Sequence, residues 1–124
     1  MTMWDADELA TIAAPEMFDL SAQLDDGTTP KTVGIWAVAV DGRLFVRSYT
    51  GLAGKWYAPA LASLRGRVSA GGVTKEVRFE PVADEATNTA IDAAYLAKYM
   101  PSPYAPEMGQ EPVRSNTLEV IPLA

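Results

Sequence analysis

The chain has 124 residues, of which 48% are hydrophobic and 21% are charged, a composition typical of one globular domain over residues 1–124. It contains no cysteine and no histidine, which removes disulfides, thiolate nucleophiles, iron–sulfur clusters and the usual general base and zinc ligand. The net charge of −6 disfavours nucleic acid as a partner, because the protein would repel the phosphate backbone.

The first predicted element is a short N-terminal helix. Asp5 and Glu8 have the spacing of a capping box, and an apolar stripe continues to about Ala13 before Pro15. The acids in this segment stand where a signal peptide needs positive charge, and no later apolar run approaches the ~20 residues of a membrane span. We therefore expect a cytoplasmic protein with no membrane partner.

A long β-hairpin is predicted next. Alternating apolar and polar residues over 18–24 indicate a strand with one exposed face, and an acidic turn follows it. Residues 32–40 are almost all apolar and predict one continuous strand, while the Asp-Gly pair at 41–42 turns the chain into a partner strand over 43–49. Trp36, in the middle of the apolar run, is interpreted as a core residue.

The second half of the chain predicts one more hairpin between two helices. Its expected elements are a helix over 55–64, strands over 67–70 and 73–80 around a Gly-Gly turn, a helix over 88–100, a proline-rich loop over 101–112 and a final strand over 117–122. Tyr95 and Tyr99 are one helical turn apart and are expected to pack on the sheet. Six strands and two or three helices indicate a mainly β fold with α, a six-stranded antiparallel barrel with covering helices.

The basic residues are concentrated in the middle of the chain. No acid occurs between Asp41 and Glu76, and six of the ten basic residues lie there: Arg43, Arg47, Lys55, Arg65, Arg67 and Lys75. These side chains either pair with acids elsewhere in the fold or form a local pocket for an anion.

A candidate phosphate site lies between the first hairpin and the second helix. Arg47 and Ser48 end a strand just before a glycine-containing loop, and Lys55 opens a helix whose free N–H groups favour an anion. A guanidinium, a hydroxyl and an ammonium together suit a phosphate group. The alternative is that Arg47 pairs with an acid on a neighbouring strand and that Lys55 is solvated.

Aromatic and basic residues nearby extend this candidate site. Trp56 and Tyr57 are placed to stack on a planar ring, or else to anchor the helix in the core. Arg67, with Arg65, flanks Gly66 where a helix meets a strand, and either arginine could meet a phosphate or protect the hairpin edge. The acidic pairs lie in turns and lack metal-binding spacing, so no metal site is predicted.

Residues 44–51 (LFVRSYTG), followed by Lys55, Trp56, Tyr57 and Leu61, resemble the small split-barrel flavoproteins, especially their deazaflavin-dependent reductase branch. The whole chain, including 93–99 (AAYLAKY), resembles an uncharacterised bacterial family, the domain of unknown function numbered 2255. The resemblance implies a split β-barrel of the FMN-binding type, often a homodimer with cofactor sites between subunits.

We therefore expect a split-barrel protein that binds a phosphate-bearing small molecule, FMN or a deazaflavin. The expected contacts are Arg47, Ser48, Gly51, Lys55, Trp56, Tyr57 and Arg67. If the protein is an enzyme, the cofactor carries a hydride transfer and no catalytic side chain is predicted. The alternative is a non-catalytic barrel that serves dimerisation or binds another small anionic molecule.

Overall fold

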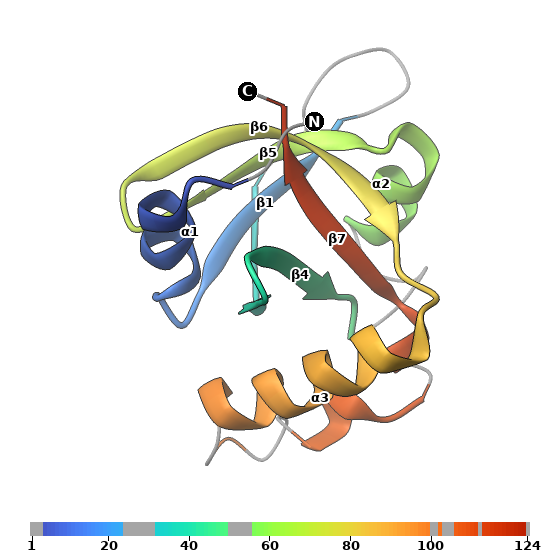
Figure 1. Cartoon of the computed structure of the whole chain (residues 1–124). Helices are drawn as coiled ribbons and strands as arrows, with labels where there is room; N and C mark the ends of the chain where they lie inside the picture. The colour runs from blue at the N-terminus through green and yellow to red at the C-terminus, as the bar shows by residue number, and fades with distance from the viewer. Residues whose placement is uncertain are drawn as a thin grey trace.

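The computed structural model of the chain describes residues 4–23, 32–49, 56–99, 102, 106–111 and 113–123. Its elements, shown in Figure 1, are α1 (Ala6–Ala13), β1 (Phe18–Ala22), β2 (Val33–Ile35), β3 (Ala37–Val40), β4 (Arg43–Arg47), α2 (Tyr57–Ser63), β5 (Arg65–Ala70), β6 (Val73–Pro81), α3 (Glu85–Tyr99), the 3-10 helices η2 (Pro106–Gly109) and η3 (Val113–Ser115), and β7 (Thr117–Pro122).

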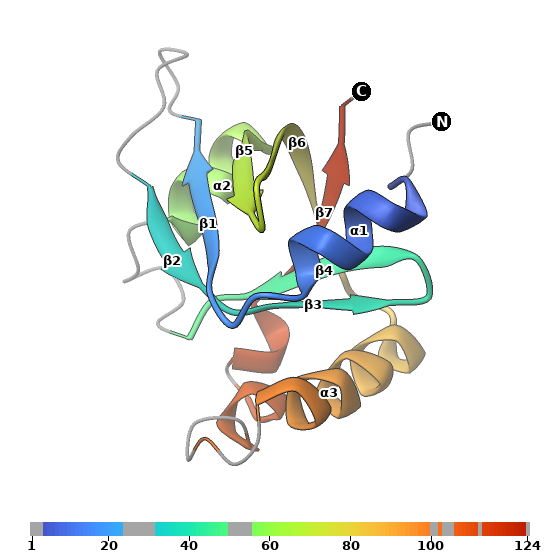
Figure 2. The same ribbon diagram turned by 90° about the vertical axis from the view of Figure 1, so that its left-hand side faces the viewer.

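The strands form one antiparallel sheet that curls into a split barrel. Their order is β2-β1-β5-β6-β7-β4-β3, so β2 and β3 are the two edges. These edges are consecutive in the chain and are joined by Trp36 alone. A sheet can have its two edges one residue apart only if it curves back on itself, and Figure 2 shows the chain passing from β2 directly into β3.

Both predicted hairpins are confirmed. Asp41 and Gly42 have φ values of 52° and 77°, and Gly71 and Gly72 have φ values of 60° and 86°. Two central residues with positive φ are the mark of the tight turn whose twist matches that of the flanking strands. The first turn joins β3 to β4, and the second joins β5 to β6.

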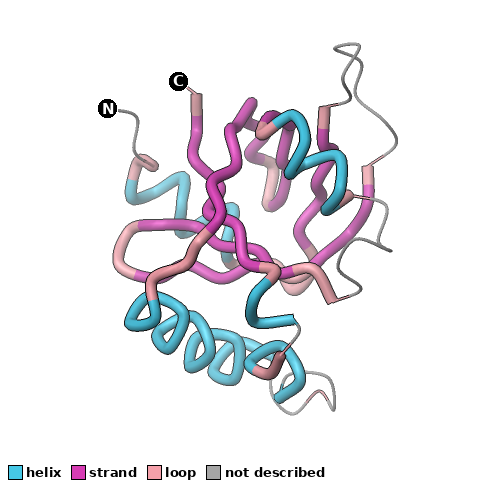
Figure 3. Tube along the Cα trace, turned by 90° about the vertical axis from the view of Figure 1, so that its right-hand side faces the viewer, coloured by secondary structure: helices cyan, strands magenta, loops and turns pink. Residues whose placement is uncertain are grey.

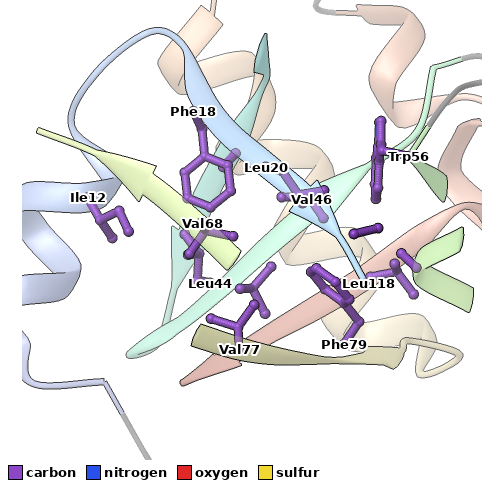
Figure 4. Packing of buried hydrophobic residues seen from close by; sticks show 14 of the residues in the cluster. Ile12, Phe18, Leu20, Leu44, Val46, Trp56, Val68, Val77, Phe79 and Leu118 are labelled. Carbon is purple, nitrogen blue, oxygen red and sulfur yellow. The ribbon is translucent and has the colours of Figure 1, made fainter. Parts of the chain in front are cut away.

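The inside of the barrel holds the larger hydrophobic core. Every strand except β2, which packs against it, contributes buried side chains to it, and Figure 4 shows them pointing toward one another from facing strands: Phe18, Leu20, Leu44, Val46, Val68, Val77, Phe79 and Leu118 among them. The predicted face of β6 is confirmed, because Val77 and Phe79 are buried whereas Glu76 and Arg78 are exposed.

A second hydrophobic core lies outside the barrel, under α3. Phe45 of β4 and Val38 of β3 point away from the barrel interior and pack with Ile91, Tyr95 and other residues of α3, η2 and η3. Figure 3 shows α3 lying along this side of the sheet. Because β4 has barrel on one face and helix on the other, both sets of its side chains are buried.

Several predicted elements differ in the structure. The expected single strand over 32–40 is two strands separated at Trp36, so the described part of the chain forms a sheet of seven strands rather than six. The last helix begins at Glu85, because Asp84 accepts hydrogen bonds from the backbone and hydroxyl of Thr87 and so caps it. The predicted loop over 101–112 contains η2. No helix in the described parts of the chain has the length and apolar character to cross a membrane.

Candidate functional site

A pocket of about 490 Å³ lies at the seam where β2 passes into β3. The described residues that line it come from five places in the chain, namely Gly34, Ile35, Trp36, Arg47, Tyr49, Trp56 and Met108. We call this the seam pocket. Its volume falls in the range of roughly 300–1,000 Å³ found for small-molecule sites, and its lining is mainly apolar and aromatic, as such sites usually are.

Trp36 forms an aromatic wall of the seam pocket. Its ring stacks on Tyr99 of α3, with ring centroids 4.1 Å apart and planes 6° from parallel. The Tyr99 hydroxyl is fixed in turn by Ala37, whose N–H donates to it at 3.0 Å and whose carbonyl accepts from it at 3.0 Å. Since Tyr99 covers one face of the indole, the pocket meets the other face or the edge.

Arg47 also lines the seam pocket and is only 2% exposed. A guanidinium has five N–H donors, and all five have partners within the chain. Nε donates to the Thr117 hydroxyl at 2.8 Å, Nη1 to Asp92 at 2.6 Å and to the Met108 carbonyl at 2.7 Å, and Nη2 to the Asn88 carbonyl and side chain. In this conformation Arg47 has no N–H left for a phosphate.

The Arg47 bonds join four elements around the seam pocket. They connect β4 to α3, to η2 and to β7, and the bond to the Met108 carbonyl holds a residue of the pocket wall. The acid that Arg47 pairs with is Asp92 on α3, not an acid on a neighbouring strand as the alternative in the sequence analysis supposed. Asp92 also pairs with Arg114 at 2.9 Å, so it bridges two arginines.

Tyr49 contributes a phenol to the lining of the seam pocket, and Glu107 lies next to it outside the lining. The Tyr49 side chain is 48% exposed, and its hydroxyl donates to the Glu107 carboxylate. Glu107 precedes Met108 in η2, so this bond also links the end of β4 to η2. The pocket therefore combines two indoles, a phenol and a nearby carboxylate.

The other predicted contacts lie in different places. Tyr57 is buried in the core of the barrel, edge-on to Trp56 with centroids 5.6 Å apart, and burial raises the pKa of its hydroxyl. Ser48 is buried, and its backbone exchanges hydrogen bonds with Asn116. Arg67 is exposed on β5, where it forms an ion pair with Glu76 at 3.1 Å. The predicted contacts Gly51 and Lys55 lie outside the described residues.

Lys98 also contacts Tyr99, the tyrosine on which Trp36 stacks. Its Nζ lies 5.0 Å from the ring centroid of Tyr99 and donates to the carbonyls of Ala13 at 2.6 Å and Ala37 at 2.7 Å. Loss of hydration lowers the pKa of Lys98 to about 8 and raises the pKa of Tyr99 to about 12. Burial raises the pKa of Tyr95 still further, so both tyrosines are neutral at pH 7.

Two of the predicted contacts, Arg47 and Trp56, line the seam pocket, and the pocket also has residues that were given no ligand role from the sequence. Trp36, interpreted as a core residue, does pack against the second core, but it also lines the pocket, and Met108 lay in a segment predicted only as loop. Tyr49 belonged to the predicted partner strand and received no role. A tryptophan in an apolar run gives no sign that the chain changes sheet edge at that residue. No group of three or more acidic side chains in the described part of the chain is arranged to hold a metal ion.

Comparison with protein families gives one match that spans most of the chain. A family described as "Uncharacterized protein conserved in bacteria (DUF2255)" matches residues 8–120. No protein with a curated function matches the sequence significantly.

Solved structures with the same fold include proteins of several activities. A putative pyridoxamine 5'-phosphate oxidase from Listeria innocua has a TM-score of 0.66 and 12% identity, over 95% of this chain and 92% of that one. An F420-H2-dependent reductase has a TM-score of 0.62 and 13% identity, over 86% of this chain and 93% of that one. An FAD-binding protein from Mesorhizobium loti has a TM-score of 0.59 and 16% identity, over 100% and 93%. The TM-scores show a shared split-barrel fold, and at identities this low function has to be argued from the site itself.

Proposed function

The chain belongs to the DUF2255 family of uncharacterized bacterial proteins, and we propose that it binds a flavin-type cofactor, FMN or a deazaflavin, in the seam pocket. The observation that carries this proposal is Trp36, a pocket residue whose indole is already stacked at 4.1 Å on Tyr99. A platform held flat before the ligand arrives loses little freedom on binding, and offset stacking on a planar ring is favourable. The F420-dependent and FAD-binding proteins of the same fold support a ligand of this class.

The seam pocket suits the ring of such a cofactor better than its phosphate. Trp36 and Trp56 offer apolar walls, and Tyr49 with Glu107 offers polar groups for the ring edge. The Arg47 donors are used within the chain, so we assign Arg47 to shaping the pocket instead of holding the phosphate. Gly51 and Lys55, which lie outside the described residues, remain the proposed phosphate contacts from the sequence, whereas Ser48 could join them only through a change of its buried position.

When bound, a flavin-type cofactor would supply hydride transfer to or from a substrate. The residues of this chain would bind and orient the ring and keep water from one face of it. We propose a homodimer as the active form, as in the split-barrel flavoproteins that the sequence resembles. The second candidate is a non-catalytic barrel that binds another planar anion, which the same aromatic walls would also accommodate.

Binding of FMN, FAD and F420 to the purified protein tests this proposal. The fluorescence of the ligand itself should be followed. A bound flavin would quench all three tryptophans by energy transfer, so quenching of protein fluorescence would not distinguish Trp36 from the other two. Trp36→Ala should weaken binding about tenfold, since an aromatic contact contributes about 0.5–1.5 kcal/mol beyond the area it buries. Trp36→Phe should restore most of the affinity.

Trp4→Phe is the matched control. Trp4 is partly buried and donates to the Val120 carbonyl at 2.9 Å, and it does not line the seam pocket. Its substitution should leave ligand affinity unchanged. Saturable binding that Trp36→Ala and Trp4→Phe affect equally would place the ligand elsewhere, and no binding of any of the three ligands would refute the proposal.

A further inference from the structure

A second pocket lies beside the β5–β6 hairpin and shares no described lining residue with the seam pocket. Its volume is about 320 Å³, and its wall includes Arg65 and Arg67 of β5, Glu76 of β6, Gln23 after β1 and Leu123 after β7. We call this the hairpin pocket. Two guanidinium groups and a carboxamide in one concave site suggest an oxyanion ligand.

Arg65 differs from the other arginines of the described residues in having no acidic partner. The remaining ones pair as Arg43 with Glu119, Arg47 with Asp92, Arg67 with Glu76, Arg78 with Glu80, and Arg114 with Glu85 and Asp92. The side chain of Arg65 forms no hydrogen bond within the described chain either, although its backbone does.

The sheet register places a second positive charge directly opposite Arg65. Arg65 pairs with Arg78 across the β5–β6 ladder, and both side chains project from the outer face of the sheet. Like charges at directly opposed positions destabilise an antiparallel pair. The next pair on the same face, Arg67 with Glu76, joins opposite charges in an ion pair, whereas the Arg65–Arg78 pair joins like charges.

Arg67 keeps donors for a ligand while paired to Glu76. Its Nε and Nη2 donate to the two carboxylate oxygens of Glu76 at 3.2 and 3.1 Å, which leaves Nη1 without a partner among the described residues. The same pair neutralises Glu76, so this acid does not repel an incoming anion at full strength. Glu80 likewise neutralises Arg78 through an ion pair. Among the described charged residues of this hairpin face, Arg65 is therefore the one whose charge is not balanced by a paired acid.

We propose that the hairpin pocket binds a phosphate group, held by Arg65 and by the free Nη1 of Arg67. A dianion at this position offsets the repulsion between Arg65 and Arg78 and provides the acidic partner that Arg65 lacks among the described residues. The site is independent of the proposed cofactor pocket, and either proposal can fail without the other.

Inorganic phosphate is the probe, with sodium chloride at equal ionic strength as the comparison. Phosphate should raise the melting temperature of the full chain more than chloride does, and calorimetry should give a saturable isotherm. Arg65→Gln should abolish the extra rise and weaken phosphate binding about tenfold or more, as expected for loss of a hydrogen bond to a charged group. In phosphate-free buffer, Arg65→Gln should melt no lower than the wild type, because it removes the like-charge pair.

Arg43→Gln is the matched control, since Arg43 is also a partly exposed strand arginine but lies outside the hairpin pocket. It should keep the full response to phosphate. Phenyl phosphate distinguishes two sources of the phosphate group. If it binds more tightly than inorganic phosphate, the ligand is the phosphate of a larger molecule; if it binds more weakly, the ligand is free phosphate. Either result supports the site. Equal responses to phosphate and chloride in the wild type, or an unchanged phosphate response in Arg65→Gln, would overturn it.

Discussion

Replacing Arg47 with methionine separates its two possible roles, shaping the fold and holding a ligand. Methionine keeps much of the apolar volume but removes all five donors, and it leaves the carbonyls of Asn88 and Met108 without these partners. Removing one partner of a buried ion pair costs about 3–5 kcal/mol. Asp92 is 26% exposed and keeps Arg114 as a partner, so we take the lower end, about 3 kcal/mol.

Urea denaturation measures this loss directly. A domain of this size has a total stability of about 5–15 kcal/mol, so the variant should still fold. At roughly 4 °C per kcal/mol, the melting temperature should fall by about 12 °C. Arg43→Met is the control on the same strand, because Arg43 is 42% exposed and has one ion pair, with Glu119, which should contribute no more than about 1 kcal/mol.

The result that would refute this reasoning is equal stability of the two variants. If Arg47→Met unfolds at the same urea concentration as Arg43→Met and has lost flavin affinity, Arg47 is a ligand contact whose internal bonds contribute little. If Arg47→Met is much less stable and still binds ligand under conditions where it is folded, its role is structural.

Two further predictions concern backbone crowding and pH. Gly66→Ala should destabilise the barrel by about 3 kcal/mol, because the added Cβ would lie 2.4 Å from the Ser21 carbonyl oxygen. Gly72→Ala, in open space at a φ of 86°, should cost about 1 kcal/mol. The urea midpoints of the two variants measure the difference. The pKa of Lys98 is lowered to about 8 in the folded chain, so between pH 8 and 10 the unfolded state binds more protons and stability should rise with pH. This rise should be absent in Lys98→Met, and a parallel pH profile of both proteins would exclude it. Above pH 10 the sign reverses, because the raised pKa of Tyr99 keeps a proton on the folded state that the unfolded state has lost.

Elements fixed by local chemistry could be predicted from the sequence. The Asp-Gly and Gly-Gly pairs allow positive φ at both turn positions, so the two hairpins follow from the residues themselves. The one-sided exposure of β6 follows from alternation, and α3 from helical spacing. Each of these features depends on neighbours within a few positions along the chain.

Arg47 shows what local patterns do not contain. An arginine at the end of an apolar strand is ordinarily expected at the surface, and its burial here depends on Asn88, Asp92, Met108 and Thr117, which are 41 to 70 positions away. A buried guanidinium is tolerated only because these distant groups satisfy every donor. The sequence contains these partner residues but does not show that they meet around Arg47 in the fold. Phosphate binding and internal pairing were therefore equally compatible with the sequence.

The break at Trp36 links the closure of the barrel to the position of the seam pocket. Residues 32–40 have the composition of one strand. In this barrel, however, the two edge strands are consecutive in the chain, so within that run the chain must leave one edge of the sheet and join the other. At that residue the backbone has left both ladders, and the Trp36 carbonyl accepts from the Tyr95 hydroxyl at 3.2 Å instead of from a strand. No strand among the described residues pairs with the backbone at Trp36, whose side chain is half-buried, and the seam pocket forms there. A ligand that stacks on Trp36 would therefore sit across the split and contact both edge regions, so its binding should slow hydrogen exchange at β2 and β3 together. Protection of only one of these strands would place the ligand elsewhere.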